Sequence, residues 1–173
     1  SREISEQRRF TGLVIDSLEF AQRNGALSGR LRLNALPRLA EVLFDTTGDL
    51  AYEVSGETAG ERTFLVLMLA GLLRLTCQRC LGAMEFALNV RNRVMLVEPG
   101  SPWPDDDQVG GLVDEACDAI EALHELDLVP LMEEEILLGL PIAPRHERCE
   151  PPATVAASAG ATPFAQLARL KRN

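Results

Sequence analysis

Two pairs of residues of metal-binding type stand out in this sequence. Cys77 and Cys80 are separated by two residues, and so are His146 and Cys149. Two cysteines at this spacing can both point at one tetrahedral ion when the chain turns tightly between strands, and the glycine at position 82 lets the backbone fold back toward the sulfurs. Because Cys₃His is a common zinc ligand set, the sequence predicts a structural zinc site formed by Cys77, Cys80, His146 and Cys149.

Two other interpretations of the first pair stay open. The cysteines could be free thiols, or they could form a redox pair. The redox interpretation is the weaker one, because thioredoxin-like motifs open a helix, whereas a strand pattern follows Cys80. The second pair is less specific than the first, since the long separation between them matches no common zinc-finger spacing.

The remaining cysteine and histidine predict no catalytic centre. Cys117 lies in an acidic stretch and is expected to be a small apolar residue rather than a ligand, and His124 is expected to be at the surface or partly packed. The sequence contains no phosphate-binding glycine loop and no HExxH motif. A complete four-ligand shell also leaves a metal without a position for substrate. We therefore expect no enzyme, and no small-molecule substrate is indicated.

The first cysteine pair requires a hairpin to position it. Residues 73–76 alternate apolar and polar side chains, and the alternation resumes over 86–90. The segment 77–82 is therefore predicted to form the tip of an antiparallel hairpin. A short helix is predicted over 16–23, and further strands, bounded by glycines at 48, 56, 60 and 71, are predicted over 27–33, 49–55 and 62–68.

A loop and a helix follow these strands. Residues 99–111 are rich in Pro, Gly and Asp, which predicts a loop. Asp127 is a suitable N-cap for a helix that runs to about residue 138 and is ended by Gly139 and Pro141. The expected fold is α+β, with a mainly antiparallel sheet, a few short helices and a CxxC knuckle at a hairpin tip, in one domain over residues 1–150.

The chain is predicted to end in a linker and a tail. Residues 151–162 are rich in Ala, Pro, Ser, Gly and Thr, which is typical of a flexible linker. Residues 163–173 predict a basic helical tail with Phe164, Leu167 and Leu170 along one side. This tail could pack on its own domain or bind a partner in a helix-in-groove contact, and both interpretations stay open.

The charge is unevenly distributed. The net charge is −9, yet residues 1–104 are neutral, residues 105–144 carry −12 and residues 145–173 carry +3. The acidic segment 105–135 is interpreted as a solvated face or as a docking surface for a basic partner. The acidic net charge excludes RNA binding through general electrostatic attraction to the chain as a whole. Local binding could still use an arginine set of Arg8, Arg9, Arg30, Arg32, Arg91 and Arg93.

The apolar segments are too short to span a membrane. The longest uncharged apolar run is 64–73, well below the roughly 20 residues that a transmembrane helix needs. No secretory signal is visible at the start of the sequence, so a cytoplasmic location is expected. In that reducing compartment, the four cysteines are expected to be thiols or metal ligands rather than disulfides.

Several separated motifs resemble one family. The sequence is similar to the large ribosomal RNA subunit accumulation protein family, the YceD family, over nearly its whole length. The order of the motifs is more specific than any one of them. They are Leu36–Leu39 (LPRL), Cys77–Leu81 (CQRCL), Leu126–Leu128 (LDL) leading into Glu133–Leu138 (EEEILL), Leu140–Cys149 (LPIAPRHERC), and the terminal Pro163–Lys171.

The resemblance implies a bacterial cytosolic protein needed for the synthesis, processing or stability of 23S ribosomal RNA. Members often carry cysteine at the position of His146, which supports a metal-ligand role there. This implies a non-enzymatic factor whose partner is large-subunit ribosomal RNA or a basic large-subunit ribosomal protein. Of the two, the acidic segment favours the basic protein, which could meet residues 105–135 through complementary charge. The alternative from another class is a metal-dependent RNA-processing enzyme that uses the acids of 105–135.

Overall fold

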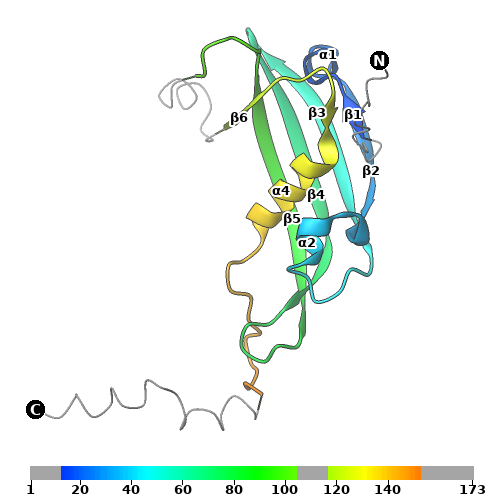
Figure 1. The fold of residues 1–173 in the computed structure, drawn as a ribbon, viewed down its shortest axis with the longest axis vertical. Coiled ribbons are helices and arrows are strands. Elements are labelled where there is room, and N and C mark those ends of the chain that lie inside the picture. The colour runs from blue at the N-terminus through cyan, green and yellow to red at the C-terminus, as the bar shows by residue number, and fades with distance from the viewer. Residues whose placement is uncertain (1–12, 105–116, 153–173) are drawn as a thin grey trace, which may run out of the picture.

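A single five-stranded sheet organises the chain (Figure 1). The structure, a computed structural model, describes residues 13–104 and 117–152. The sheet has the order β2-β3-β4-β5-β6, and the predicted mainly antiparallel α+β fold is confirmed. Its antiparallel strands are β2 (Ala26–Arg32), β3 (Asp49–Ala59), β4 (Arg62–Thr76) and β5 (Ala83–Val97), while β6 (Asp118–Glu121) runs parallel to β5.

The other described elements are short, apart from one helix. They are β1 (Val14–Ile15), paired with β7 (Leu126–Asp127), and the helices α1 (Ser17–Gln22), η1 (Leu33–Ala35), α2 (Pro37–Ala40) and α4 (Leu128–Gly139). None of the helices in the described ranges is long and apolar enough to cross a membrane. The predicted linker beyond Pro152, the tail 163–173 and the loop residues 105–111 lie outside the described residues.

The helices cover one face of the sheet and leave the other open (Figure 1). Helix α1 packs on β3 and β4, α4 packs on β4 and β5, and α2 packs against α4. On the covered face, alternate leucines of β4 from Leu65 to Leu75 are buried, apart from the glycine at position 71. On the other face, Met68 and Leu72 are 42% and 63% exposed, whereas Phe64 and Val66, nearer the start of β4, are buried. We call this second surface the open face; no described helix covers it.

Two glycines lie inside strands instead of ending them. The predicted strand boundaries at Gly56 and Gly71 are wrong, because β3 and β4 continue through these positions. A Cβ atom on Gly56 would lie 2.4 Å from the Cα atom of Ala21, and one on Gly71 would lie 2.4 Å from a methyl carbon of Leu50. These glycines therefore allow α1 and a neighbouring leucine to pack directly against the sheet.

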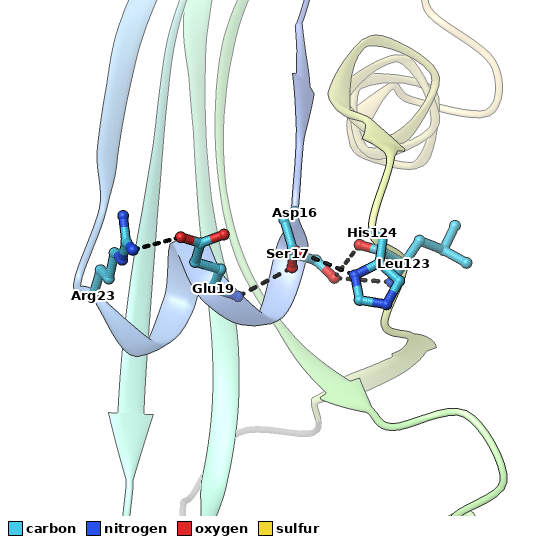
Figure 2. Close-up of polar contacts among 6 residues, drawn as sticks. All are labelled: Asp16, Ser17, Glu19, Arg23, Leu123 and His124. Atoms are coloured by element: carbon cyan, nitrogen blue, oxygen red, sulfur yellow. Dashed lines mark hydrogen bonds and ion pairs between the residues drawn. The ribbon is translucent and has the colours of Figure 1, made fainter.

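The start of α1 is tied to the segment before β7 (Figure 2). The helix confirms the prediction for 16–23, with the Asp16 carboxylate accepting from the Glu19 amide at 3.2 Å. The buried Ser17 hydroxyl donates to the Leu123 carbonyl at 3.0 Å and accepts from the Leu123 amide at 2.9 Å. The exposed His124 contacts Asp16 at 3.0 Å, which confirms its expected place at the surface.

Helix α4 also confirms its predicted bounds, but two of its acids are not on the surface. Asp127 caps the helix by accepting from the Val129 amide at 3.1 Å. Glu133 and Glu135 are only 4% and 7% exposed, so the interpretation of 105–135 as one acidic surface is wrong for both. Glu133 accepts from the Leu39 amide in the first turn of α2 at 2.9 Å. A side-chain acceptor oxygen at this helix N-terminus satisfies an amide that the helix itself cannot.

Glu135 is buried against a different element, strand β5. Its carboxylate accepts from the side-chain amide of Asn92 on β5 at 2.8 Å. Burial raises the pKa of the Glu135 carboxyl, and the Asn92 hydrogen bond opposes that increase. The two buried glutamates thus join α4 to α2 on one side and to the sheet on the other.

We expect Glu133→Ala to lower the free energy of unfolding by about 1–3 kcal/mol, because the Leu39 amide would stay buried without an acceptor. Glu133→Gln keeps an acceptor oxygen and should cost less. Glu134→Ala, at an exposed position of the same helix, should change stability by about 0.5 kcal/mol or less. Urea unfolding measures all three, and equal effects of Glu133→Ala and Glu134→Ala would contradict the capping assignment.

We expect pH to affect the contact between Asp16 and His124. Their hydrogen bond raises the pKa of His124 above 6.5 and lowers that of Asp16 below 3.8. The contribution of the pair to stability is therefore complete between about pH 4 and 6.5; it is lost as pH rises through the raised pKa of His124, or falls through the lowered pKa of Asp16. In Asp16→Asn, which keeps a good N-cap, an NMR titration should show the His124 pKa returning toward 6.5. An unchanged His124 pKa would refute the contact.

Candidate metal centre

The first cysteine pair lies in the turn that joins β4 to β5, as predicted. Cys77 follows the last residue of β4, and its amide donates to the Gly82 carbonyl at 2.9 Å. The Leu81 amide donates to the Cys77 carbonyl, also at 2.9 Å. These two bonds close the turn and hold Cys77 and Cys80 on the same side of the hairpin tip.

The residue with unusual backbone geometry in this turn is Leu81, not Gly82. Leu81 has a φ of 60°, in the left-handed region that favours glycine. The φ angle of Gly82 is not in this region. The expectation that Gly82 supplies the conformational freedom of the turn is therefore wrong. The Leu81 side chain is 56% exposed, so burial gives it little compensation for the strain.

The second pair reaches the same tip from the far end of α4. The chain after α4 runs down beside the hairpin (Figure 1). The Gln78 amide donates to the Pro144 carbonyl at 2.8 Å, which fixes this chain next to the turn. The His146 amide points at the Cys77 sulfur at 3.5 Å. Residues separated by more than sixty positions are thereby brought together.

The four predicted ligands form one cluster. One side-chain donor atom from each of Cys77, Cys80, His146 and Cys149 lies within 4.8 Å of the other three. The sulfurs of Cys77 and Cys149 are 3.7 Å apart, and Cys80 Sγ lies 3.3 Å from His146 Nδ1. Zn–S bonds of about 2.3 Å at tetrahedral angles place two sulfurs about 3.8 Å apart. The donor set and its spacing therefore fit a tetrahedral metal ion.

The orientation of His146 also fits a metal ligand. Its Nε2 atom lies 3.0 Å from the Ala83 carbonyl oxygen, which can only accept a hydrogen bond. Nε2 therefore carries the proton, and the lone pair of Nδ1 faces the sulfurs. Metal-binding histidines commonly donate their second ring nitrogen to a backbone carbonyl in this way.

The surroundings of Cys77 favour a thiolate. The side chain is fully buried, which by itself raises the pKa of the thiol. The amides of Cys80, His146 and Arg79 point at its sulfur and outweigh burial, so the pKa of Cys77 falls to about 5. For Cys149, burial and then the neighbouring sulfurs raise the pKa. Sulfurs this close cannot all ionise without a cation between them.

The other candidate residues lie elsewhere. Cys117 donates to the Arg93 carbonyl at 3.0 Å and does not join the cluster. All four cysteines are free of disulfides. Within residues 13–104 and 117–152, the cluster of cysteines and histidine is the one group of three or more potential ligands, so the described acids do not converge on a second site.

Four of the six arginines considered for RNA binding share the open face. Residues opposite each other in an antiparallel pair project to the same side. Arg30 is in register with Ala51, which pairs with Ala70, while Arg91 pairs with the exposed Met68. Arg32 and Arg93 project to the same side by alternation. Arg8 and Arg9 lie outside the described residues.

These four arginines differ in whether they form ion pairs within the protein. Arg30 pairs with Asp49 at 2.5 Å, and Arg93 pairs with Glu57 at 3.3 Å and stacks on the Phe64 ring. Arg32 and Arg91 are exposed and form no ion pair among the residues that the structure describes. The open face therefore offers two arginines for an external contact.

Comparison with known proteins assigns the chain to a family. The family model described as large ribosomal RNA subunit accumulation protein YceD matches residues 65–171. A protein of that name from Haemophilus influenzae is 29% identical over 145 residues, which cover 80% of this chain and 78% of the relative. No solved structure matches this chain. Because the family match spans more than half of the chain and contains all four residues of the cluster, the protein belongs to the YceD family of large ribosomal RNA subunit accumulation proteins.

Proposed function

We propose that this protein is a non-enzymatic factor that supports the accumulation of 23S ribosomal RNA in the cytoplasm, by promoting the synthesis, processing or stability of that RNA. The observation that carries the proposal is membership of a family named for accumulation of the large ribosomal RNA subunit. The ligand cluster supports the non-enzymatic part. Four protein ligands fill a tetrahedral shell, and catalytic zinc sites usually keep one position for water or substrate.

The proposed metal is zinc in a structural role. Three thiol groups and one imidazole form a ligand set that zinc binds in small structural sites, and the observed sulfur spacing suits its bond length. When bound, the ion would cross-link the hairpin tip to the chain after α4. Cys77 would supply a ready thiolate, and the Ala83 carbonyl would hold His146 in the required orientation.

We expect purified protein to contain one zinc ion per chain and Cys80→Ser to lose it. The expected consequence is faster hydrogen exchange in residues 77–82 and 144–149, because the ion no longer joins them. Cys117→Ser is the matched control: it also removes one thiol but lies outside the cluster, so it should keep its zinc. Well below one zinc per chain in the unmodified protein would exclude the site.

The partner proposed first is ribosomal RNA, bound at the open face. Arg32 and Arg91 are exposed there, and arginine binds phosphate through paired hydrogen bonds. The competing partner is a basic large-subunit ribosomal protein bound to the acidic segment. That alternative is weakened because Asp127, Glu133 and Glu135 are engaged in capping or buried contacts within the fold.

We expect crosslinking in cells to recover large-subunit RNA with the protein. Replacing both Arg32 and Arg91 by Gln should lower the recovery by about tenfold, since each phosphate contact contributes to a salt-dependent affinity. The matched control replaces Arg23 and Arg38, two exposed arginines of the helical layer, and should leave the recovery unchanged.

The same experiment separates the two partners. Recovery of a basic ribosomal protein without RNA, unaffected by the open-face variant, would favour the acidic segment as the binding surface. Recovery of neither large-subunit RNA nor a ribosomal protein would contradict the proposed function.

A further inference from the structure

An apolar groove lies between α2, the end of β4 and the chain that follows α4. Its lining includes Val42, Leu75, Leu137, Leu140, Ile142 and Pro144, and its volume is about 270 Å³. Pockets that enclose whole small molecules usually measure about 300–1,000 Å³. A groove of this size instead suits one or two apolar side chains of a peptide.

Two residues of the groove are unusually exposed for their type. Ile142 is 103% exposed and Val42 is 48% exposed. Leu138, on the neighbouring turn of α4, is 71% exposed. Exposed apolar side chains beside a groove commonly mark a site where another segment or molecule binds.

We propose that the C-terminal segment of the same chain, residues 163–172, occupies this groove as a short amphipathic helix. The segment places Phe164, Leu167 and Leu170 at helical spacing along one side. A helix of this length is marginal in water by itself and needs an apolar surface to pack against. The groove supplies such a surface.

The end of the described chain lies close to the groove. The described chain ends at Pro152, three residues after Cys149, and Cys149 Sγ is 3.7 Å from Cys77 Sγ. Gln78, which follows Cys77, lines the groove. Residues 151–162, whose composition predicts a flexible linker, then connect to the tail, and a linker of this type and length has an r.m.s. end-to-end distance of about 20 Å. The linker can therefore return the tail to the groove. Such a connection gives a local concentration on the order of millimolar, so even a weak contact is populated.

The charges at the groove complement those of the tail. The tail carries Arg169, Lys171 and Arg172 at its end. Glu41 adjoins Val42, and Glu134 lies one turn before Leu137 and Leu138; both glutamates are exposed. Neither forms an ion pair with any residue in the described ranges. A docked tail therefore brings basic side chains to an acidic margin, which selects this segment over an acidic one.

Hydrogen exchange and NMR on the full chain test the proposal. In the unmodified protein, amides of residues 164–170 should exchange at least about tenfold more slowly than in an unstructured peptide. Replacing Phe164 and Leu167 by Ser should remove this protection and shift the resonances of Val42 and Ile142. Ala165→Ser, on the opposite side of the tail helix, is the matched control and should preserve both signals.

A substitution in the groove tests the other partner of the contact. Ile142→Glu should release the tail without loss of core packing, because the side chain is fully exposed. Leu72→Glu, on the open face, is the matched control and should leave the tail protected. Exchange of 164–170 at the unstructured rate in the unmodified protein would overturn the proposal. So would protection that Ile142→Glu leaves intact, or protection that increases with protein concentration and so indicates a second copy.

Discussion

The position of α4 depends on the contacts that the sulfur of Cys77 makes. This atom is buried at the end of a fifteen-residue strand, accepts from three amides and lies 3.7 Å from Cys149 Sγ. It thereby holds the chain after α4 against the hairpin tip. At the other end of α4, β7 pairs with β1, and Ser17 binds Leu123. The helix is thus fixed at both ends across the sheet, and its apolar residues cover the leucines of β4.

Buried carboxylates then set the contacts of α4 with its neighbours. Burying a charge is costly unless it is hydrogen-bonded, and both buried glutamates have a donor: the Leu39 amide for Glu133 and the Asn92 side chain for Glu135. Asp127 caps the same helix. Three of the seven acids in the described part of the acidic segment therefore form contacts within the fold. Net charge over a stretch of sequence does not by itself identify a binding surface.

The sequence patterns that predicted elements correctly were local. Capping by Asp16 and Asp127, the alternation on both sides of the hairpin tip and the cysteine spacing all act over a few residues. The errors concern long-range packing. Nothing near Gly71 indicates that Leu50 fills its missing side-chain position, and nothing near Glu133 indicates that it will meet the start of α2. The parallel pairing of β6 and the four-residue α2 were missed because such short segments carry no readable period.

The residues that form the candidate site were predictable from the sequence, but the backbone conformation that presents them was not. Cysteine and histidine spacing identified all four members of the cluster, whereas the left-handed residue proved to be Leu81. A leucine in this conformation costs about 1–2 kcal/mol relative to a glycine. Such strain persists where the surroundings over-determine the backbone. Here the Cys77 amide donates to the Gly82 carbonyl and the Leu81 amide donates to the Cys77 carbonyl. These two bonds close the turn around Leu81 and hold its backbone in the left-handed conformation while Cys77 and Cys80 lie on the same side of the tip.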